Sequence, residues 1–117
     1  MNDSSILTLA VKSLDDKRAE NIVALNMKGV SLIADYFVIC HGNSDKQVQA
    51  IAQELKKVVQ DEGIEIKRLE GFDQARWVLI DLGDVVVHVF HKEERIYYNL
   101  EKLWGDAPTV ELEGVLG

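Results

Sequence analysis

The sequence has little cysteine and little proline: Cys40 and Pro108 are the single residues of their kind. One cysteine excludes a disulfide within the chain, and alone it cannot build a zinc site from several thiolates. Cys40 ends an apolar run at 36–40. We therefore expect a buried, unreactive thiol of the kind found in reducing compartments.

Positive charge is also scarce. The chain carries 13 Lys and Arg against 20 Asp and Glu, which gives a net charge of −7. A surface that follows phosphates needs clustered Lys and Arg, so this balance disfavours a membrane or an extended nucleic acid as the partner. It favours cationic partners, basic proteins among them, and we expect little direct contact with nucleic acid.

Long apolar runs are absent as well. No uninterrupted run approaches the ~20 residues that a membrane-spanning helix needs, and residues 1–11 lack the basic start of a signal peptide. We therefore expect a cytoplasmic protein. The hydrophobic fraction of 47% is that of a folded protein, and 117 residues is close to the commonest size of one domain.

The sequence does contain a clear alternation of helical and strand patterns. Apolar residues at helical spacing predict helices near 4–14, 44–62 and 93–104. Apolar runs predict strands at 22–27, 36–40 and 64–69. Ser44 followed by Gln47 is typical of a helix start, and Gly63 of a helix end.

Residues 77–90 predict a hairpin that turns at Gly83 and Asp84. In that register one face is wholly aliphatic, whereas the other carries Trp77 among apolar and polar groups. A large aromatic residue with acidic neighbours is typical of the centre of a protein interface. The alternative is that the last helix covers this face, which would make Trp77 part of the core.

The predicted order is helix, strand, strand, helix, three strands and helix. It favours an α/β (α+β) fold with a mixed sheet of about five strands and packed helices, in a single domain over 1–105. Neither a helical bundle nor an all-β barrel fits this order. Residues 106–117 contain three acids and no base. We expect them to form an acidic C-terminal tail that is flexible or loosely docked.

A strand, a glycine and a serine that opens a helix, at 40–44, also occur in many phosphate-binding sites. Phosphate loops need several glycines and a lysine to surround the phosphate. Here Gly42 is alone, and no lysine occupies the matching place. We therefore favour the interpretation that Gly42 makes a turn and Ser44 caps the helix.

The carboxylate pair that nucleotidyl transfer uses to hold magnesium is not found in the next strand, because Glu65 is followed two residues later by Lys67. His88 lies diagonal to Asp81 on the predicted hairpin, as an acid–base pair would. No nucleophile is evident beside them, and we therefore favour a structural or interface histidine. We expect no catalytic residue, no metal and no cofactor.

Three segments together resemble the ribosomal silencing factor family, also called the Iojap family. They are DYFVICHGNSDKQVQAIAQEL at 35–55, WVLIDLGDVVVHVF at 77–90 and ERIYYNLEKLW at 94–104. The resemblance covers residues 4–104 and implies a nucleotidyltransferase-like fold without the catalytic carboxylates, hence no enzyme. It also implies binding to the large ribosomal subunit through its ribosomal protein fourteen. That binding would block joining of the small subunit and repress translation when nutrients are short.

The resemblance implies partner binding by the hairpin and the loop before it, at Trp77, Asp81, Leu82, Asp84, Asp73 and Arg76. Tyr97 and Tyr98 match aromatic positions of the last helix, where it implies packing. It also admits a homodimer through the exposed hairpin. Two alternatives stay open. One is a factor in large-subunit biogenesis that uses the same surface, and the other is a residual enzyme that binds a nucleotide at 41–44.

Overall fold

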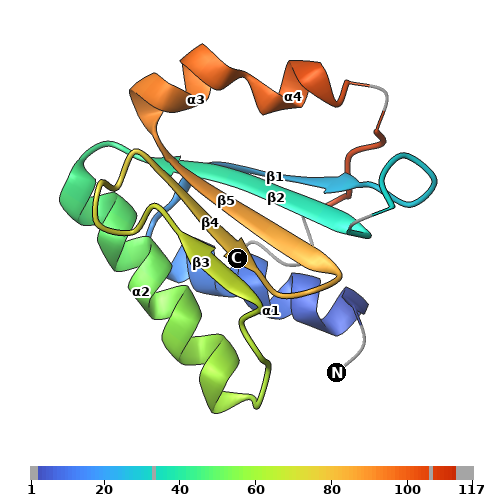
Figure 1. The fold of residues 1–117 in the computed structure, drawn as a ribbon, viewed down its shortest axis with the longest axis horizontal. Helices are drawn as coiled ribbons and strands as arrows, with labels where there is room; N and C mark the ends of the chain where they lie inside the picture. Colours follow the sequence, from blue (N-terminus) through green and yellow to red (C-terminus); the bar gives the residue numbers. More distant parts are fainter. Residues whose placement is uncertain (1–2, 33, 106, 113–117) are drawn as a thin grey trace.

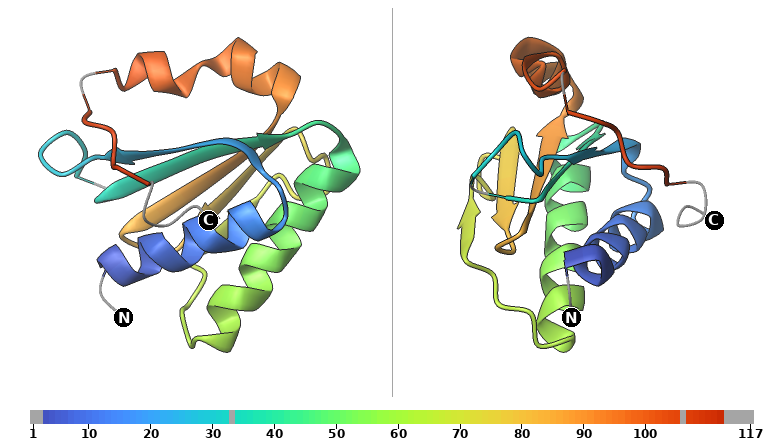
Figure 2. Two further views of the ribbon diagram at one scale, coloured as in Figure 1. Left: turned by 180° about the vertical axis from the view of Figure 1, so that it is seen from behind. Right: turned by 90° about the vertical axis from the view of Figure 1, so that its right-hand side faces the viewer.

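The computed structural model describes residues 3–32, 34–105 and 107–112, which form one mixed α/β domain in three layers (Figures 1 and 2). The central sheet has five strands: β1 (Glu20–Asn26), β2 (Tyr36–Gly42), β3 (Arg68–Glu70), β4 (Trp77–Asp81) and β5 (Val85–His91). Helices α1 (Asp3–Asp16) and α2 (Asp45–Asp61) cover one face of the sheet, and α3 (Lys92–Tyr98) and α4 (Leu100–Leu103) lie on the other. This arrangement confirms the predicted fold class. Among the described residues, no helix is long and apolar enough to cross a bilayer.

The strands follow the spatial order β1-β2-β5-β4-β3, with β2 and β5 parallel and all other neighbours antiparallel. The β4–β5 hairpin has the predicted register, in which Val78 faces Val89 and Ile80 faces Val87. Its turn closes with a bond from the Leu82 N–H to the Val85 carbonyl at 2.9 Å. The two-residue turn signal was therefore sufficient to set the alignment of the whole hairpin.

The start and end of α2 are also as predicted. The Ser44 hydroxyl accepts the Gln47 N–H at 3.1 Å, which satisfies a backbone donor that the helix leaves free. The Gln47 side chain returns to the N–H of Asn43 at 2.7 Å, one residue earlier than in the usual capping box. Gly63 follows the helix with φ of +76°, the left-handed conformation that favours glycine.

Two apolar cores lie on the two faces of the sheet. The larger core joins α1 and α2 to the sheet, and its members share almost complete burial; they include Leu14, Ile51, Leu55, Val38, Val78, Ile80 and Val87. The smaller core lies under α3 and α4 and contains Leu25, Met27, Ile39, Phe90 and Ala107. Cys40 is fully buried in the larger core, which confirms the prediction for its thiol.

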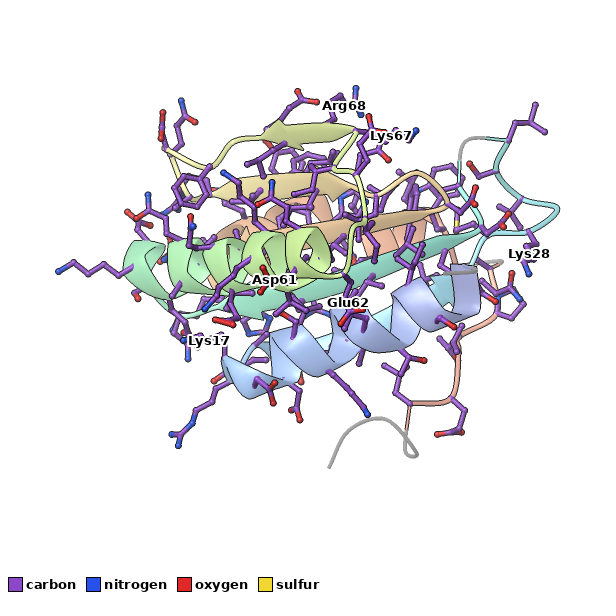
Figure 3. All side chains as sticks on the ribbon, turned by 90° about the horizontal axis from the view of Figure 1, so that it is seen from below. Lys17, Lys28, Asp61, Glu62, Lys67 and Arg68 are labelled. Carbon is purple, nitrogen blue, oxygen red and sulfur yellow. The ribbon has the colours of Figure 1, made fainter. Side chains whose placement is uncertain are left out.

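The third strand is shorter than predicted. Pairing begins only at Arg68, whereas the sequence pattern indicated a strand from residue 64. The reason is that Ile64 and Ile66 satisfy their apolar pattern by packing against the larger core, without a partner strand. Lys67 then donates its N–H to the Asp81 carbonyl at 2.7 Å, and pairing with β4 follows. The charged side chains of Lys67 and Arg68 lie at the outer margin of the sheet (Figure 3).

The prediction of one continuous last helix over 93–104 was wrong. Asn99 adopts φ of +47° between α3 and α4, a conformation that asparagine tolerates better than most residues. The break also corrects the packing side that helical spacing indicated, because Ile96 and Leu103 are 80% and 69% exposed. Leu100 and Trp104 do pack against the smaller core. The side chain of Tyr97 lies outside the described part of the chain.

Residues 107–112 run along the free edge of β1. Asn26 donates its N–H to the Pro108 carbonyl and Val110 donates to the Ala24 carbonyl, both at 2.8 Å. Ala107 enters the smaller core and Leu112 the larger one, so this segment passes from one face of the sheet to the other. We refer to 107–112 as the C-terminal segment. The domain boundary after residue 105 stays a prediction.

Candidate functional site

One part of the sheet is left open on the side of α3 and α4. Leu100 and Trp104 pack with residues of β1, β2 and β5, and Tyr98 of α3 reaches only the start of β4 at Trp77, so the rest of β4 and β3 lie beyond these helices (Figure 1). Alternation along β4 directs Trp77, Leu79 and Asp81 to this side, and all three are half-buried. We call these three residues the β4 face.

Trp77 is held by aromatic contacts on several sides. Its ring stacks on Phe90 with centroids 5.0 Å apart, and the ring of Tyr98 from α3 lies 4.7 Å away. The indole N–H donates to Nδ1 of His88 at 3.1 Å. The ring is thus anchored in the smaller core and is half-buried, while its role at a protein interface stays a prediction.

His88 is a buried polar residue in the middle of this aromatic group. It is 4% exposed, and burial lowers the pKa of its imidazole to about 4. His88 does not pair with Asp81 as an acid–base pair would, which agrees with the favoured interpretation of a structural histidine. His88 bonds to Trp77 instead, and the Asp81 carboxylate accepts the N–H of Gly83 at 2.8 Å across the turn.

A shallow cavity of about 320 Å³ lies beside Trp77 and is lined by Glu70, Gly71, Trp77 and Leu79. Gly71 has φ of +79°, and a Cβ at this position would collide with the carbonyl oxygen of Trp77. The cavity therefore depends on a glycine, because the loop approaches β4 more closely than any side chain allows.

The structure does not bring all six predicted binding residues together. Leu82 is 5% exposed and belongs to the larger core, on the other side of the hairpin. Asp84 is exposed at the turn, where its carbonyl accepts the N–H groups of Asp35 and Tyr36 at 2.8 and 3.0 Å. Asp73 and Arg76 lie before β4, at the opposite end of the strand. Trp77 and Asp81 are the two that share the β4 face.

Arg76 connects the start of β4 to the helices above and below it. Its guanidinium donates to Glu94 at 2.9 Å and to Glu93 at 3.3 Å, and it lies 3.7 Å from Asp45. The bond to Glu94 is the main cause that raises the pKa of Arg76 above its usual value. Because this guanidinium contacts three carboxylates of the chain itself, its first role is to hold the starts of α2 and α3 beside β4.

The residues at 41–44 use their polar groups within the protein. Ser44 and Gln47 satisfy the first N–H groups of α2, as the turn-and-cap interpretation predicted. His41 connects the Glu20 carboxylate, at 3.2 Å, to the Arg95 guanidinium, at 2.9 Å. No local pattern in the sequence indicates this network, because its members lie 21 and 54 residues apart in the chain. In the part of the chain that the structure describes, no group of three or more His, Cys, Asp or Glu could hold a metal ion.

Residues 2–116 match the family described as "Ribosomal silencing factor during starvation". The chain belongs to this family. The match includes the C-terminal segment, which sequence analysis had placed beyond the conserved domain.

Two bacterial relatives are similar to this chain over almost their whole length. A "Ribosomal silencing factor RsfS" of Halalkalibacterium halodurans is 78% identical over 116 residues, which cover 99% of each chain. Another of Bacillus subtilis is 69% identical over 97% of this chain and 96% of its own. A crystal structure of a protein from Bacillus halodurans aligns with a TM-score of 0.85 and 74% identity, covering 94% of this chain and 100% of that one.

Proposed function

We propose that this protein is a ribosomal silencing factor that acts in the cytoplasm by binding the large ribosomal subunit through its ribosomal protein fourteen. While bound, it blocks the approach of the small subunit and represses translation when nutrients are short. No bond is made or broken in this mechanism, which is steric. The observation that carries the proposal is membership of the silencing factor family over residues 2–116.

The β4 face has the properties that such docking needs. Trp77 supplies a rigid aromatic surface that is half-buried in its own core, so little conformational entropy is lost when a partner covers it. Asp81 on the same face and Asp84 at the turn add negative charge to the rim. The net charge of −7 favours a basic ribosomal protein and steers the encounter.

The remaining predicted residues have supporting places in this proposal. Leu82 is buried beneath the turn and fixes its position from the opposite face. Asp73 and Arg76 lie where the β4 face ends, near the starts of α2 and α3, and contribute only to the margin of the contact. A second copy of the chain is another possible occupant of the same face, and it would compete with the ribosome.

Replacement of Trp77 by alanine tests the proposal. We expect Trp77→Ala to weaken binding to purified large subunits by about 2 kcal/mol or more, because the centre of the contact is lost. Co-sedimentation of the variant with large subunits measures the loss, and sedimentation of the protein alone detects any self-association.

Trp104→Ala is the matched control. Trp104 is also half-buried on the same side of the sheet, but it packs on Phe37 under α4. Its loss also removes an aromatic side chain that packs against the smaller core. The proposal requires the control to bind as the wild type does. Equal recovery of both variants with large subunits would refute the role of the β4 face, and enrichment on immature particles alone would favour the biogenesis function.

A further inference from the structure

The bond between Trp77 and His88 defines the protonation state of the histidine. An indole N–H is a donor and never an acceptor, so Nδ1 of His88 must accept at 3.1 Å. The imidazole is therefore neutral, with its proton on Nε2. Burial favours the same state, because it lowers the pKa of His88 to about 4 and leaves Nδ1 free to accept at neutral pH.

Nε2, the other ring nitrogen of His88, takes no part in this hydrogen bond. Nε2 is buried and has no hydrogen-bond partner among the described residues. A buried donor without a partner destabilises a fold, whereas an apolar side chain of similar volume would avoid that cost. His88 lies among Phe37, Trp77 and Phe90, where a leucine would fit chemically. Stability alone thus does not account for a histidine here.

What the histidine adds is control over the orientation of Trp77. Stacking on Phe90 and a tilted contact with Tyr98 hold the plane of the indole, but such ring contacts tolerate sliding and rotation of the ring. A hydrogen bond from one defined edge selects a single orientation. The open side of Trp77 and the cavity lined by Leu79 and Gly71 then keep one shape.

We propose that His88 is a positioning residue of the β4 face, whose Nδ1 fixes the indole of Trp77 in the orientation that the ribosomal partner meets. This inference rests on the proposed function, because it assigns to His88 the preorganisation of the same docking surface. In this role His88 acts through Trp77 and does not itself contact the partner.

Two substitutions separate positioning from packing. His88→Leu removes the buried unpaired donor on Nε2 but also the acceptor of the partly buried indole N–H, so the two effects oppose each other and the variant should melt close to the wild type. His88→Asn places an amide oxygen near the position of Nδ1 but leaves an amide group buried, so it should melt lower. We expect His88→Leu to bind large subunits about tenfold more weakly, and His88→Asn to remain within about threefold of the wild type. The more stable variant, His88→Leu, would then be the one that binds more weakly.

The indole proton of Trp77 gives a readout that does not involve the ribosome. In the wild type its ¹⁵N–¹H resonance should be shifted by the hydrogen bond and protected from exchange. In His88→Leu it should move and exchange faster, while the indole of Trp104 stays unchanged. An unchanged Trp77 resonance in His88→Leu would overturn the inference, as would equal loss of binding in both variants. If the wild type failed to bind large subunits, the proposed function would fall, and the resonance would still decide whether His88 holds Trp77.

Discussion

Burial shifts the pKa values of two side chains on the central strands in opposite directions. It raises the pKa of Cys40 to about 12 and lowers that of His88 to about 4, because both groups are more easily buried in their neutral forms. The thiol can stay neutral at no cost at physiological pH. The imidazole also stays neutral, but only as long as the pH remains well above 4.

The lowered pKa of His88 makes a prediction about acid stability. The unfolded chain takes up this proton near pH 6.5 and the folded protein only near pH 4, so the free energy of unfolding falls as the pH drops through that window. We expect the wild type to lose on the order of 2 kcal/mol more than His88→Leu between pH 7 and pH 4.5. Urea unfolding of both proteins at each pH measures the difference. Parallel curves would show that His88 is not buried in its neutral form.

The residues of the β4 face could be predicted in part from the sequence. The turn at Gly83 and Asp84 fixed the register, and the register placed Trp77 and Asp81 on one side. Local patterns gave no indication that Trp77 would bond to His88, because the donor and acceptor lie on different strands and their ring orientations depend on packing. The same register placed Leu82 on the aliphatic face, where the structure buries it, and only the resemblance implied a contact role for this residue.

At the scale of single elements, the loop before β4 is the most constrained connection beside the candidate site. Gly71→Ala forces a left-handed conformation on a residue with a side chain and drives its Cβ into Trp77. We expect it to cost about 3 kcal/mol or more of unfolding free energy. Gly63→Ala is the control, since Gly63 has a similar φ but open space around it, and it should cost about 1 kcal/mol. Equal losses in chemical denaturation would contradict the close approach of loop and strand.

The C-terminal segment is docked on β1, in the region for which the sequence predicted a flexible or loosely docked tail. A chain that ends at residue 105 loses the burial of Leu112 and the two backbone bonds to β1. We expect it to be less stable by about 3 kcal/mol. A chain that ends at residue 112 keeps these contacts and serves as the control. If thermal unfolding does not distinguish the two chains, the segment does not contribute to the fold.

Elements with a local signal were predicted well, and those that depend on distant partners were not. The cap at Ser44 and the turn at Gly83 act within a few residues, so the sequence shows them directly. The late start of β3, the break at Asn99 and the docking of 107–112 depend on which surface each segment meets in the folded chain. A single sequence does not contain that information in a local pattern.

At the scale of the whole molecule, the protein is a five-stranded sheet with helices on both sides and an open region over β4. Its residues 2–116 match the silencing factor family, and its negative charge suits a basic partner. Under the proposed function the domain acts through its bulk once the β4 face has docked. The molecule therefore needs a firm attachment and a stable shape, and it needs no reaction centre.

The most direct test is the rate at which purified ribosomal subunits join. Light scattering should show that the wild type, added to large subunits first, slows or prevents formation of the joined particle, whereas Trp77→Ala has little effect. In sucrose gradients the wild type should travel with the large subunit and not with the small one. Undiminished joining in the presence of saturating wild-type protein would contradict the account.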